Sequence, residues 1–419
     1  MPRVEGLPAR RAALQMLDAI LRRDQTLDGA ASAAARNLAP VDRALAMAIA
    51  GEALRRLPDL DALIDSATRQ PLPTDSKARM VLRLALAQKI GLGTAEHALV
   101  ATALPLVDGG PRRLVHGVLG NLLRRGVPPI NEPRLPQAVE ERWRAAWSDQ
   151  VVMAARRQIV RRPPLDLTFA EEQPAQAYAA QHDGISLAPK SVRLPSSSVA
   201  ELPGFGEGQW WVQDLAASLP ARLIGGEARD VLDLCAAPGG KTMQLAAAAH
   251  RVTAVDSSES RLGRLRENLE RTHLSAQLVH GNALLWEPSG PFDAILLDAP
   301  CSATGTFRRH PEVLYRARPN IIASGTELQQ ELLSRASSWL KPGGSLVYCV
   351  CSLEPQEGEE VVAAFLKTQR DFLIDRPKAG ELPDFAAPSG EGWVRILPGL
   401  LEDEGGLDGF FMVRLVRTP

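Results

Sequence analysis

The sequence predicts an α/β protein: a doubly wound, Rossmann-like parallel sheet preceded by an all-helical domain and a small mixed α+β region. Three observations support this. Residues 8–126 carry apolar stripes at helical spacing. The stretch "VPPINEPRLP" then interrupts the pattern with four prolines. From about residue 207, short apolar strands alternate with helical segments, as in βαβ units. We therefore expect domains at 1–128, 129–206 and 207–419.

The first domain is predicted to be helical because its apolar residues recur on one face. In "ARRAALQMLDAILRR", Leu14, Leu17 and Leu21 form a single stripe with arginines at both ends. The segments "VDRALAMAIAGEALRRL", "SKARMVLRLALAQKIGLG" and "RRLVHGVLGNLLRRG" have the same character. Gly126 is expected to end the last of these helices, since glycine favours the position after a helix.

The region 129–206 is predicted to be mixed. A short helix is expected around Trp143 and Trp147, and "RRPPLDLTF" has the character of a strand entrance. The stretch "SVRLPSSSVAELPGF" is rich in turn-forming residues and is predicted to be loop-rich.

The last domain is predicted to hold a parallel sheet with helices on both faces. The helices include "ESRLGRLRENLERTH" and "ELQQELLSRASSWL", and "GFFMVRLVR" is expected to be a final strand. The strands that begin near 231 and 293 are continuously apolar, as strands buried on both faces are. The five expected core strands are 231–235, 252–256, 277–280, 293–298 and 345–351.

Composition and charge narrow the class of protein. The chain has 45% apolar and 23% charged residues, which is typical of a soluble globular protein. Its apolar runs are shorter than the roughly 20 residues that span a bilayer, and no apolar core follows the basic N-terminus. We expect a cytoplasmic monomer without a membrane partner. Residues 1–162 hold 25 Lys and Arg against 16 Asp and Glu, a net charge of +9, and the remainder carries −10. This asymmetry fits either a polyanionic partner or solvated helix faces.

The four cysteines lie at positions 235, 301, 349 and 351. They lack the paired spacing of zinc ligands, so no metal is expected. A disulfide framework is not expected in a cytoplasmic protein of this size. The thiols are therefore either small buried hydrophobes or groups used in chemistry.

The turn in "DLCAAPGGKTMQL" joins a strand to a helix and is expected to bind a ligand. A phosphate loop would need glycine where Cys235 stands, and Pro238 restricts the backbone that would wrap the phosphate. The glycine spacing of a dinucleotide site is also absent. The turn residues expected to contact the ligand are Cys235, Ala236, Ala237, Pro238, Gly239, Gly240 and Lys241.

Two further strand ends define the ligand. Asp256 ends the next strand, 17 residues after Gly239, where an acid characteristically takes ribose hydroxyls. Asn282 follows the third strand, where the edge of an adenine can be recognised. A ligand with a ribose, an adenine and an amino-acid tail fits this set, and we predict S-adenosylmethionine.

Two Cys-Ser pairs occur at the carboxyl ends of the last two core strands. They lie in "LLDAPCSATGTFRRHP" and "VYCVCSLEPQEGEE". Ligands of α/β sheets bind at this edge. Either cysteine alone would be read as a buried structural residue, but two such pairs at one edge favour chemistry.

These blocks resemble the RNA cytosine-5 methyltransferases of the Sun/Nop2 family. "DLCAAPGGKT", "LLDAPCSATGTFRRHP" and "YCVCSLEPQEGEE" carry the resemblance, together with "GQWWVQDLAASLPARLI" and "LDGFFMVRLVR". The N-terminal helices resemble the RNA-binding antitermination factor NusB. The combination is similar to the bacterial 16S rRNA methyltransferases of the Sun/Fmu type. The chain departs from the family at Asn282, where Asp is usual, and at Val350, where Thr is usual.

The resemblance implies roles for individual residues. It implies that Cys351 is the nucleophile and that Cys301 helps to release the product. Asp298 would contact the target cytosine, and Lys241 would bond polar groups of the base or Asp298. The residues implied at the cofactor are Cys235, Ala236, Ala237, Pro238, Gly239, Gly240, Lys241, Asp256, Asn282 and Asp298.

The expected partner is RNA, with 16S rRNA preferred and tRNA as the alternative. The target base must leave its stack to reach such a site. Arg308 and Arg309, which follow Cys301, are predicted to bind phosphates near that base, or else to form a solvated basic loop. A different class of function, a non-catalytic RNA-binding assembly or antitermination factor, is opposed by the presence of Cys301, Cys351 and Asp256 together.

Overall fold

The computed structural model describes residues 5–195 and 199–419 and divides into two compact units. Unit 1 runs to Arg161 and also includes Phe307–Arg316. Unit 2 consists of Arg162–Thr306 and Ala317–Pro419. The predicted boundary at 128 therefore lies inside unit 1. No helix of the described residues has both the length and the apolar composition needed to cross a membrane.

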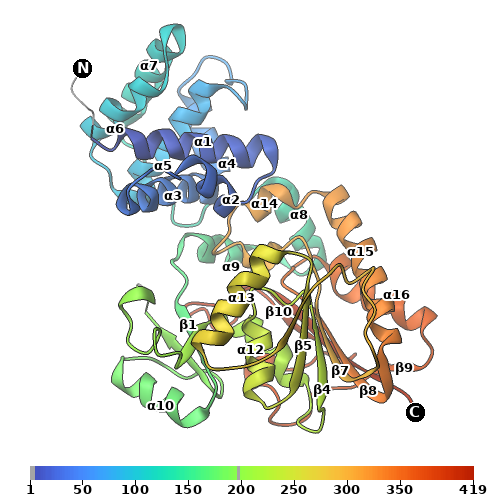
Figure 1. Cartoon of the computed structure of the whole chain (residues 1–419). Coiled ribbons are helices and arrows are strands. Elements are labelled where there is room, and N and C mark those ends of the chain that lie inside the picture. The colour runs from blue at the N-terminus through green and yellow to red at the C-terminus, as the bar shows by residue number, and fades with distance from the viewer. Residues whose placement is uncertain (1–4, 196–198) are drawn as a thin grey trace. The chain divides into compact units, whose positions relative to one another are not determined.

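Unit 1 is all helical, as predicted for its first 126 residues (Figure 1). Helix α8 contains Trp143 and is the short helix that the sequence predicted there. Helix α9 is an additional helix that follows it. The helices are α1 (Leu7–Arg23), α2 (Leu27–Ala34), α3 (Pro40–Arg55), α4 (Leu57–Ser66), α5 (Lys77–Leu92), α6 (Glu96–Ala103), η1 (Leu104–Leu106), α7 (Gly109–Arg125), α8 (Gln137–Ala146), α9 (Asp149–Val160) and α14 (Val313–Arg316).

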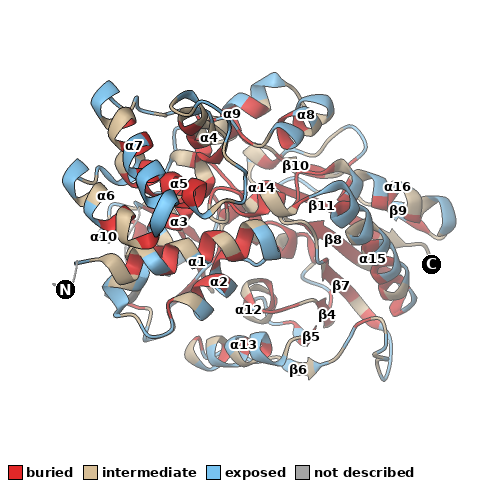
Figure 2. Cartoon of the chain, turned by 90° about the horizontal axis from the view of Figure 1, so that it is seen from above, coloured by how far each residue is buried: buried red, intermediate tan, exposed pale blue. Residues whose placement is uncertain are grey.

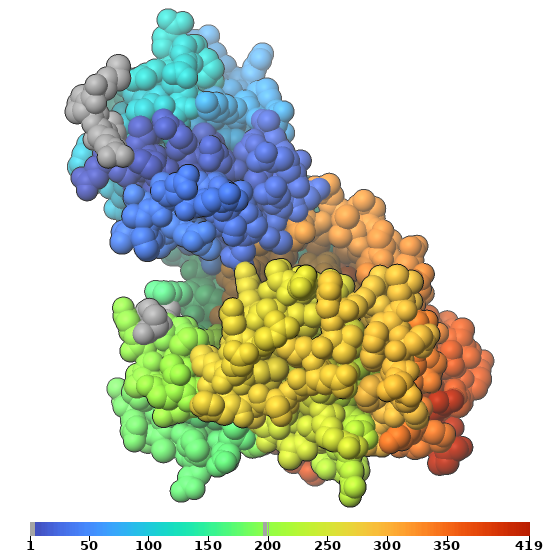
Figure 3. Space-filling view, in the orientation of Figure 1, coloured from blue at the N-terminus to red at the C-terminus, as the bar shows by residue number. Residues whose placement is uncertain are grey.

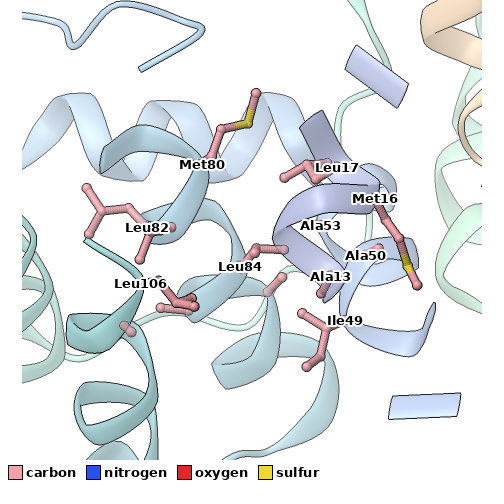
Figure 4. Close-up of a cluster of buried hydrophobic side chains, with 14 of the residues drawn as sticks. Ala13, Met16, Leu17, Ile49, Ala50, Ala53, Met80, Leu82, Leu84 and Leu106 are labelled. Carbon is pink, nitrogen blue, oxygen red and sulfur yellow. The ribbon is translucent and has the colours of Figure 1, made fainter. Parts of the chain in front are cut away.

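The core of unit 1 forms where small residues let helices approach closely. Ala13 of α1 and Ala50 and Ala53 of α3 are fully buried beside larger apolar side chains (Figure 4). Helix α5 is buried on nearly all sides, and its two buried arginines, Arg79 and Arg83, are paired with aspartates of α4. In this core the aspartates thus compensate both arginines for their lost hydration.

The segment Phe307–Arg316 belongs to the packing of unit 1 although it is distant in sequence. The Phe307 ring lies 5.6 Å from that of Trp143. Glu312 accepts a 2.9 Å hydrogen bond from the backbone N–H of Leu27, and the Tyr315 hydroxyl donates to the carbonyl of Leu54 at 2.7 Å. Unit 1 is therefore completed by residues that follow the Cys301 loop in the sequence.

A small antiparallel sheet opens unit 2, with the strand order β2-β1-β3. Its elements are β1 (Leu165–Phe169), α10 (Glu172–Gln181), β2 (Ser191–Leu194), η2 (Val199–Glu201) and β3 (Trp210–Val212). The expected strand entrance is β1. The stretch "SVRLPSSSVAELPGF", predicted to be loop-rich, begins with strand β2, which pairs with β1 and has all four of its residues buried. Residues 196–198 of that stretch lie outside the described residues.

The main sheet has the order β10-β11-β8-β7-β4-β5-β6, with β9 paired to β11. The five predicted core strands form its parallel part, and the final strand β11 runs antiparallel to β8. The strands are β4 (Asp230–Leu234), β5 (Arg251–Asp256), β6 (Gln277–His280), β7 (Phe292–Asp298), β8 (Leu340–Val350), β9 (Phe372–Ile374), β10 (Val394–Ile396) and β11 (Phe410–Arg417).

Helices cover both faces of this sheet. The apolar residues of β7 divide accordingly: Ile295 and Leu297 pack with α15 and α16, whereas Ala294 and Leu296 pack with α11, η3 and α12. Figure 2 shows both buried (red) and exposed (pale blue) residues on α15 and α16, as expected of helices that cover a sheet. The helical elements are α11 (Leu215–Ser218), η3 (Pro220–Leu223), α12 (Gly240–Ala247), α13 (Glu259–Arg271), η4 (Thr304–Thr306), α15 (Pro319–Ser338), η5 (Pro355–Glu357), α16 (Glu359–Thr368) and η6 (Asp384–Ala386).

Candidate active site

The predicted ligand turn connects β4 to α12. Cys235 has a left-handed backbone with φ of 57°, the Ala237–Pro238 peptide is cis, and Gly239 has φ of 107°. A Cβ at Gly239 would collide with the Leu265 side chain. Glycine is therefore required at this position for two reasons, its backbone conformation and the close approach of α13.

Asp256 stands at the end of β5, as predicted, and its side chain is fully buried. One carboxylate oxygen accepts from the backbone N–H of Ala237 at 3.1 Å. The other accepts from the N–H of Ser258 at 2.8 Å and from Arg261 at 2.9 Å. A carboxylate has about four acceptor sites. Three of these sites accept hydrogen bonds from within the protein, so one remains for a ligand. A second site would become available if Arg261 moved away.

A cavity of about 400 Å³ joins the predicted ligand residues to the predicted cysteines. Its volume lies within the range of about 300–1,000 Å³ that is usual for small-molecule sites. Asn282 lines it, and the side-chain oxygen of Asn282 accepts from the N–H of Leu284 at 3.0 Å. The principal lining residues are Cys235, Ala237, Asp256, Arg261, Asn282, Asp298, Cys301 and Cys351. Figure 3 shows residues 250–300, in yellow to orange, as a continuous surface of this unit.

Lys241 and Asp298 form an ion pair beside this cavity. The Lys241 Nζ lies 2.7 Å from Asp298 Oδ2 and 5.2 Å from the centroid of the Phe410 ring. Burial alone would lower the pKa of Lys241, but the attraction to Asp298, its hydrogen bond to that carboxylate and the nearby Cys349 and Cys351 together raise the pKa above its ordinary value. Lys241 is therefore a cation at neutral pH. Its ammonium group is oriented by Asp298, the carboxylate that the family resemblance assigns to the target base.

The two predicted thiols lie side by side because β7 and β8 are neighbours in the sheet. The sulfurs of Cys301 and Cys351 are 3.6 Å apart. The hydrogen bond with Cys351, followed by burial, raises the pKa of the Cys301 thiol well above its ordinary value. The thiolate form of Cys301 is thus disfavoured in this arrangement.

The remaining cysteines are placed differently. Burial raises the pKa of the Cys235 thiol to about 12, and burial also raises that of Cys349 well above its ordinary value. The Cys349 sulfur lies 3.5 Å from Asp298 Oδ1. High pKa values disfavour the thiolate, so neither side chain is suited to act as a nucleophile.

The expectation for Arg308 was wrong. Its side chain is 1% exposed and belongs to the packing of unit 1, so it is not available to an RNA phosphate. Arg309 is partly exposed. The "RRHP" stretch has the composition of a basic loop, but Phe307 just before it and Glu312 just after it are both buried.

Two buried carboxylates escaped the sequence analysis. Asp233 of β4 accepts from the Thr242 hydroxyl at 2.5 Å, and burial raises its pKa to about 7. Glu357 of η5 is fully buried behind the two Cys-Ser pairs. It lies within "EPQEGEE", which has the composition of a solvated surface loop, so no local signal distinguished it. The described residues contain no group of three or more side chains suited to hold a metal ion.

Unit 2, which contains the cavity, has the fold of a Rossmann-like methyltransferase. A crystal structure of a methyltransferase homologue from Pyrococcus horikoshii matches 71% of this chain and 98% of its own, with 27% identity and a TM-score of 0.56. The crystal structure of PH0851 matches 98% of both chains with a TM-score of 0.72; at 22% identity it shows the fold alone.

Sequence comparison identifies the family. Residues 223–416 match the family described as 16S rRNA methyltransferase RsmB/F, and residues 7–124 match the NusB family. Ribosomal RNA small subunit methyltransferase B of Xylella fastidiosa is 34% identical over 99% of both chains. The enzyme of the same name from Vibrio cholerae is 34% identical over 97% of both. The chain belongs to the RsmB/F family of rRNA methyltransferases, which confirms the predicted resemblance.

Proposed function

We propose that this protein transfers a methyl group from S-adenosylmethionine to carbon 5 of a cytosine in RNA, with 16S rRNA as the substrate. The observation that carries the proposal is the pair of thiols 3.6 Å apart in the wall of a cavity that also holds Asp256 and Asp298. The names of the relatives, which are small-subunit rRNA methyltransferases, support the choice of RNA.

The cavity suits S-adenosylmethionine through its donor set. Asp256 retains one acceptor site for a ribose hydroxyl, and the side-chain nitrogen of Asn282 can donate to an adenine edge. The turn from Cys235 to Lys241 would receive the amino-acid tail. When bound, this cofactor supplies an electrophilic methyl group.

The cysteines address the low reactivity of cytosine. Carbon 5 is too electron-poor to take a methyl group directly. The Cys351 thiolate would add to carbon 6, and the electron pair of the carbon 5–carbon 6 double bond would make carbon 5 nucleophilic. Asp298, oriented by Lys241, would hydrogen-bond the base as charge develops on the ring. After carbon 5 is methylated it must lose its proton, so that the double bond re-forms and the sulfur leaves as a thiolate.

The contact between the thiols supports assigning that proton to Cys301. The hydrogen bond with Cys351 is the largest cause of the raised pKa of Cys301, and the charge of Cys351 adds to it. Both contributions end once the Cys351 sulfur is bonded to carbon 6. The Cys301 thiol then becomes more acidic and can release its own proton to water, after which its thiolate can accept the carbon 5 proton directly or through a water. Adduct formation thereby prepares the base that resolves the adduct.

The test uses three variants with labelled S-adenosylmethionine and 16S rRNA. Cys351→Ala should bind RNA and cofactor but transfer no methyl group. Cys301→Ala should transfer methyl and then accumulate as a protein–RNA adduct that survives denaturing gels. The double variant should form no adduct. Full activity in both single variants would exclude covalent catalysis, and an adduct from Cys351→Ala alone would reverse the two roles.

The helical unit is proposed to bind the RNA. The +9 charge of residues 1–162 and the match to the NusB family support this. Phosphate contacts release counterions, so affinity should fall steeply between 50 and 200 mM salt, by roughly 10³-fold for about six contacts. Affinity for 16S rRNA fragments that is independent of salt would contradict the proposal. Preferential methylation of tRNA would keep the chemistry and change the substrate.

A further inference from the structure

A buried carboxylate connects the two Cys-Ser loops. Glu357 is fully buried and accepts hydrogen bonds from both residues that follow the proposed catalytic cysteines. Its Oε1 accepts from the backbone N–H of Ser302 at 2.8 Å. Its Oε2 accepts from the Ser302 hydroxyl and, at 2.5 Å, from the Ser352 hydroxyl. One carboxylate thus links the residue after Cys301 to the residue after Cys351.

A third segment joins the same carboxylate. Gln329 of α15 donates from Nε2 to Glu357 Oε1 at 3.2 Å and to the carbonyl of Pro300, just before Cys301, at 2.8 Å. All four acceptor sites of the carboxylate are therefore occupied. The main chain of Glu357 is held as well, because the Tyr348 hydroxyl donates to its carbonyl at 2.6 Å. The group is fixed at both its backbone and its side chain.

Holding a carboxylate in the interior is unfavourable unless donors compensate for the lost hydration. Here two of the four donors come from Ser302 and one from Ser352, and the two serine hydroxyls are themselves 3.2 Å apart. The compensation is complete only while both loops keep this arrangement. Movement of either loop would leave a buried charge partly unpaired, so the charge opposes any separation of the cysteines.

We propose that Glu357 is a positioning residue for the two-thiol reaction: its carboxylate holds the Cys301 and Cys351 loops in the register that keeps the two sulfurs in contact. The inference rests on the proposed function. Glu357 is not in contact with either sulfur through any of these bonds and acts through the adjacent serines. Its removal should therefore change the rate of covalent chemistry and leave cofactor binding intact.

The test compares Glu357→Gln with the matched control Asp293→Asn. Asp293 also accepts several hydrogen bonds, from the N–H groups of Arg229 and Asp230 and from Lys341, but at the opposite edge of the sheet. In Glu357→Gln the amide nitrogen must face a donor, which loosens the loops. A displacement of about 1 Å lowers rates about 10²-fold. We expect a kcat about 10²-fold lower, with the Kd for S-adenosylmethionine within twofold of the parent.

Single-turnover adduct formation locates the defect. In the Cys301→Ala background, adding Glu357→Gln should slow the appearance of the protein–RNA adduct by a similar factor, while adding Asp293→Asn should not. Unchanged kcat and adduct rates in Glu357→Gln would overturn the inference. If that variant fails to fold, Ser302→Ala and Ser352→Ala, which retain the carboxylate, provide the test. Each should lower kcat at least threefold, and together their effects should be non-additive, because they share one partner; two fully active serine variants would also overturn it.

The two proposals fail in different ways. If Cys301→Ala forms no adduct and Cys351→Ala remains active while Glu357 is intact, the covalent mechanism is wrong whatever Glu357 does. If the adduct forms normally in Cys301→Ala and equally fast when Glu357→Gln is added, the mechanism stands and only the positioning role is lost.

Discussion

Strand β7 carries a lysine–aspartate pair at each of its ends, and the two pairs differ in the burial of their lysines. At the carboxyl end Asp298 pairs with Lys241 at 2.7 Å, and at the amino end Asp293 pairs with Lys341 at 2.6 Å. The Lys241 side chain is 9% exposed and that of Lys341 is 40% exposed. The same kind of ion pair therefore has a buried lysine beside the cavity at one end and is a surface contact between the adjacent strands β7 and β8 at the other.

The largest expected difference comes from removing each lysine. Lys241→Met leaves Asp298, whose side chain is 32% exposed, without its cation beside the cavity. We expect methyl transfer to 16S rRNA to fall at least about 10²-fold, because the carboxylate loses its orientation. Lys341→Met should stay within about 1 kcal/mol in stability, as surface pairs do, and retain full activity. Equal activity losses in both variants would show that the two ends are functionally equivalent.

The next comparison concerns the ends of β5 and β4. Asp256→Ala removes a carboxylate from the carboxyl edge, where charge-assisted hydrogen bonds are each worth about 1.5–3 kcal/mol. We expect binding of S-adenosylmethionine to weaken at least about tenfold. Asp230→Ala, which breaks the exposed pair with Arg251 at the amino edge, should leave it unchanged. Titration calorimetry measures both, and tight binding of ATP or NAD with none of S-adenosylmethionine would exclude the proposed cofactor.

Buried Asp233 should give stability a dependence on pH. Its pKa is raised by burial from 3.8 to about 7, so the folded state binds a proton that the unfolded state has lost between these values. Stability should then decrease as pH rises from about 4 to 7, by at most about 1.4 kcal/mol per pH unit. Asp233→Asn removes this contribution. The difference between the two urea unfolding free energies should therefore change with pH across this range, and a constant difference would contradict the assignment.

Asp293 should show the opposite sign with a smaller effect. Its hydrogen bond from the Asp230 backbone, followed by that from Lys341, lowers its pKa from 3.8 to about 2. The stabilisation is present above about pH 4 and is lost as pH falls towards 2. Asp293→Asn should lower stability at pH 7 by about 1 kcal/mol and should differ less from the parent near pH 2. Urea unfolding at pH 7 and pH 3 checks this, and a gap that widens in acid would exclude it.

Local sequence patterns were enough to predict the framework of both units. Periodic apolar residues gave the helices of unit 1 and the five parallel strands of unit 2, because each pattern depends on residues close in sequence. The same reasoning placed Asp256, Asp298, Cys301 and Cys351 at one edge of the sheet, since parallel strands with right-handed crossovers end on the same side. The motif resemblance then added chemical roles to these positions.

Tertiary structure alone decided how those groups are used. The contact between Cys301 and Cys351 and the bonds from Ser302 and Gln329 to Glu357 join segments far apart in the chain. The bond from Ala237 to Asp256 and the burial of Arg308 within unit 1 likewise depend on the folded chain. A residue such as Glu357, in a run of charged residues, is exposed or buried according to what packs over it, and that depends on strand order and register. Charge and nucleophilicity follow burial, so the sequence by itself determined which groups reach the site, and the fold determined their protonation and their partners.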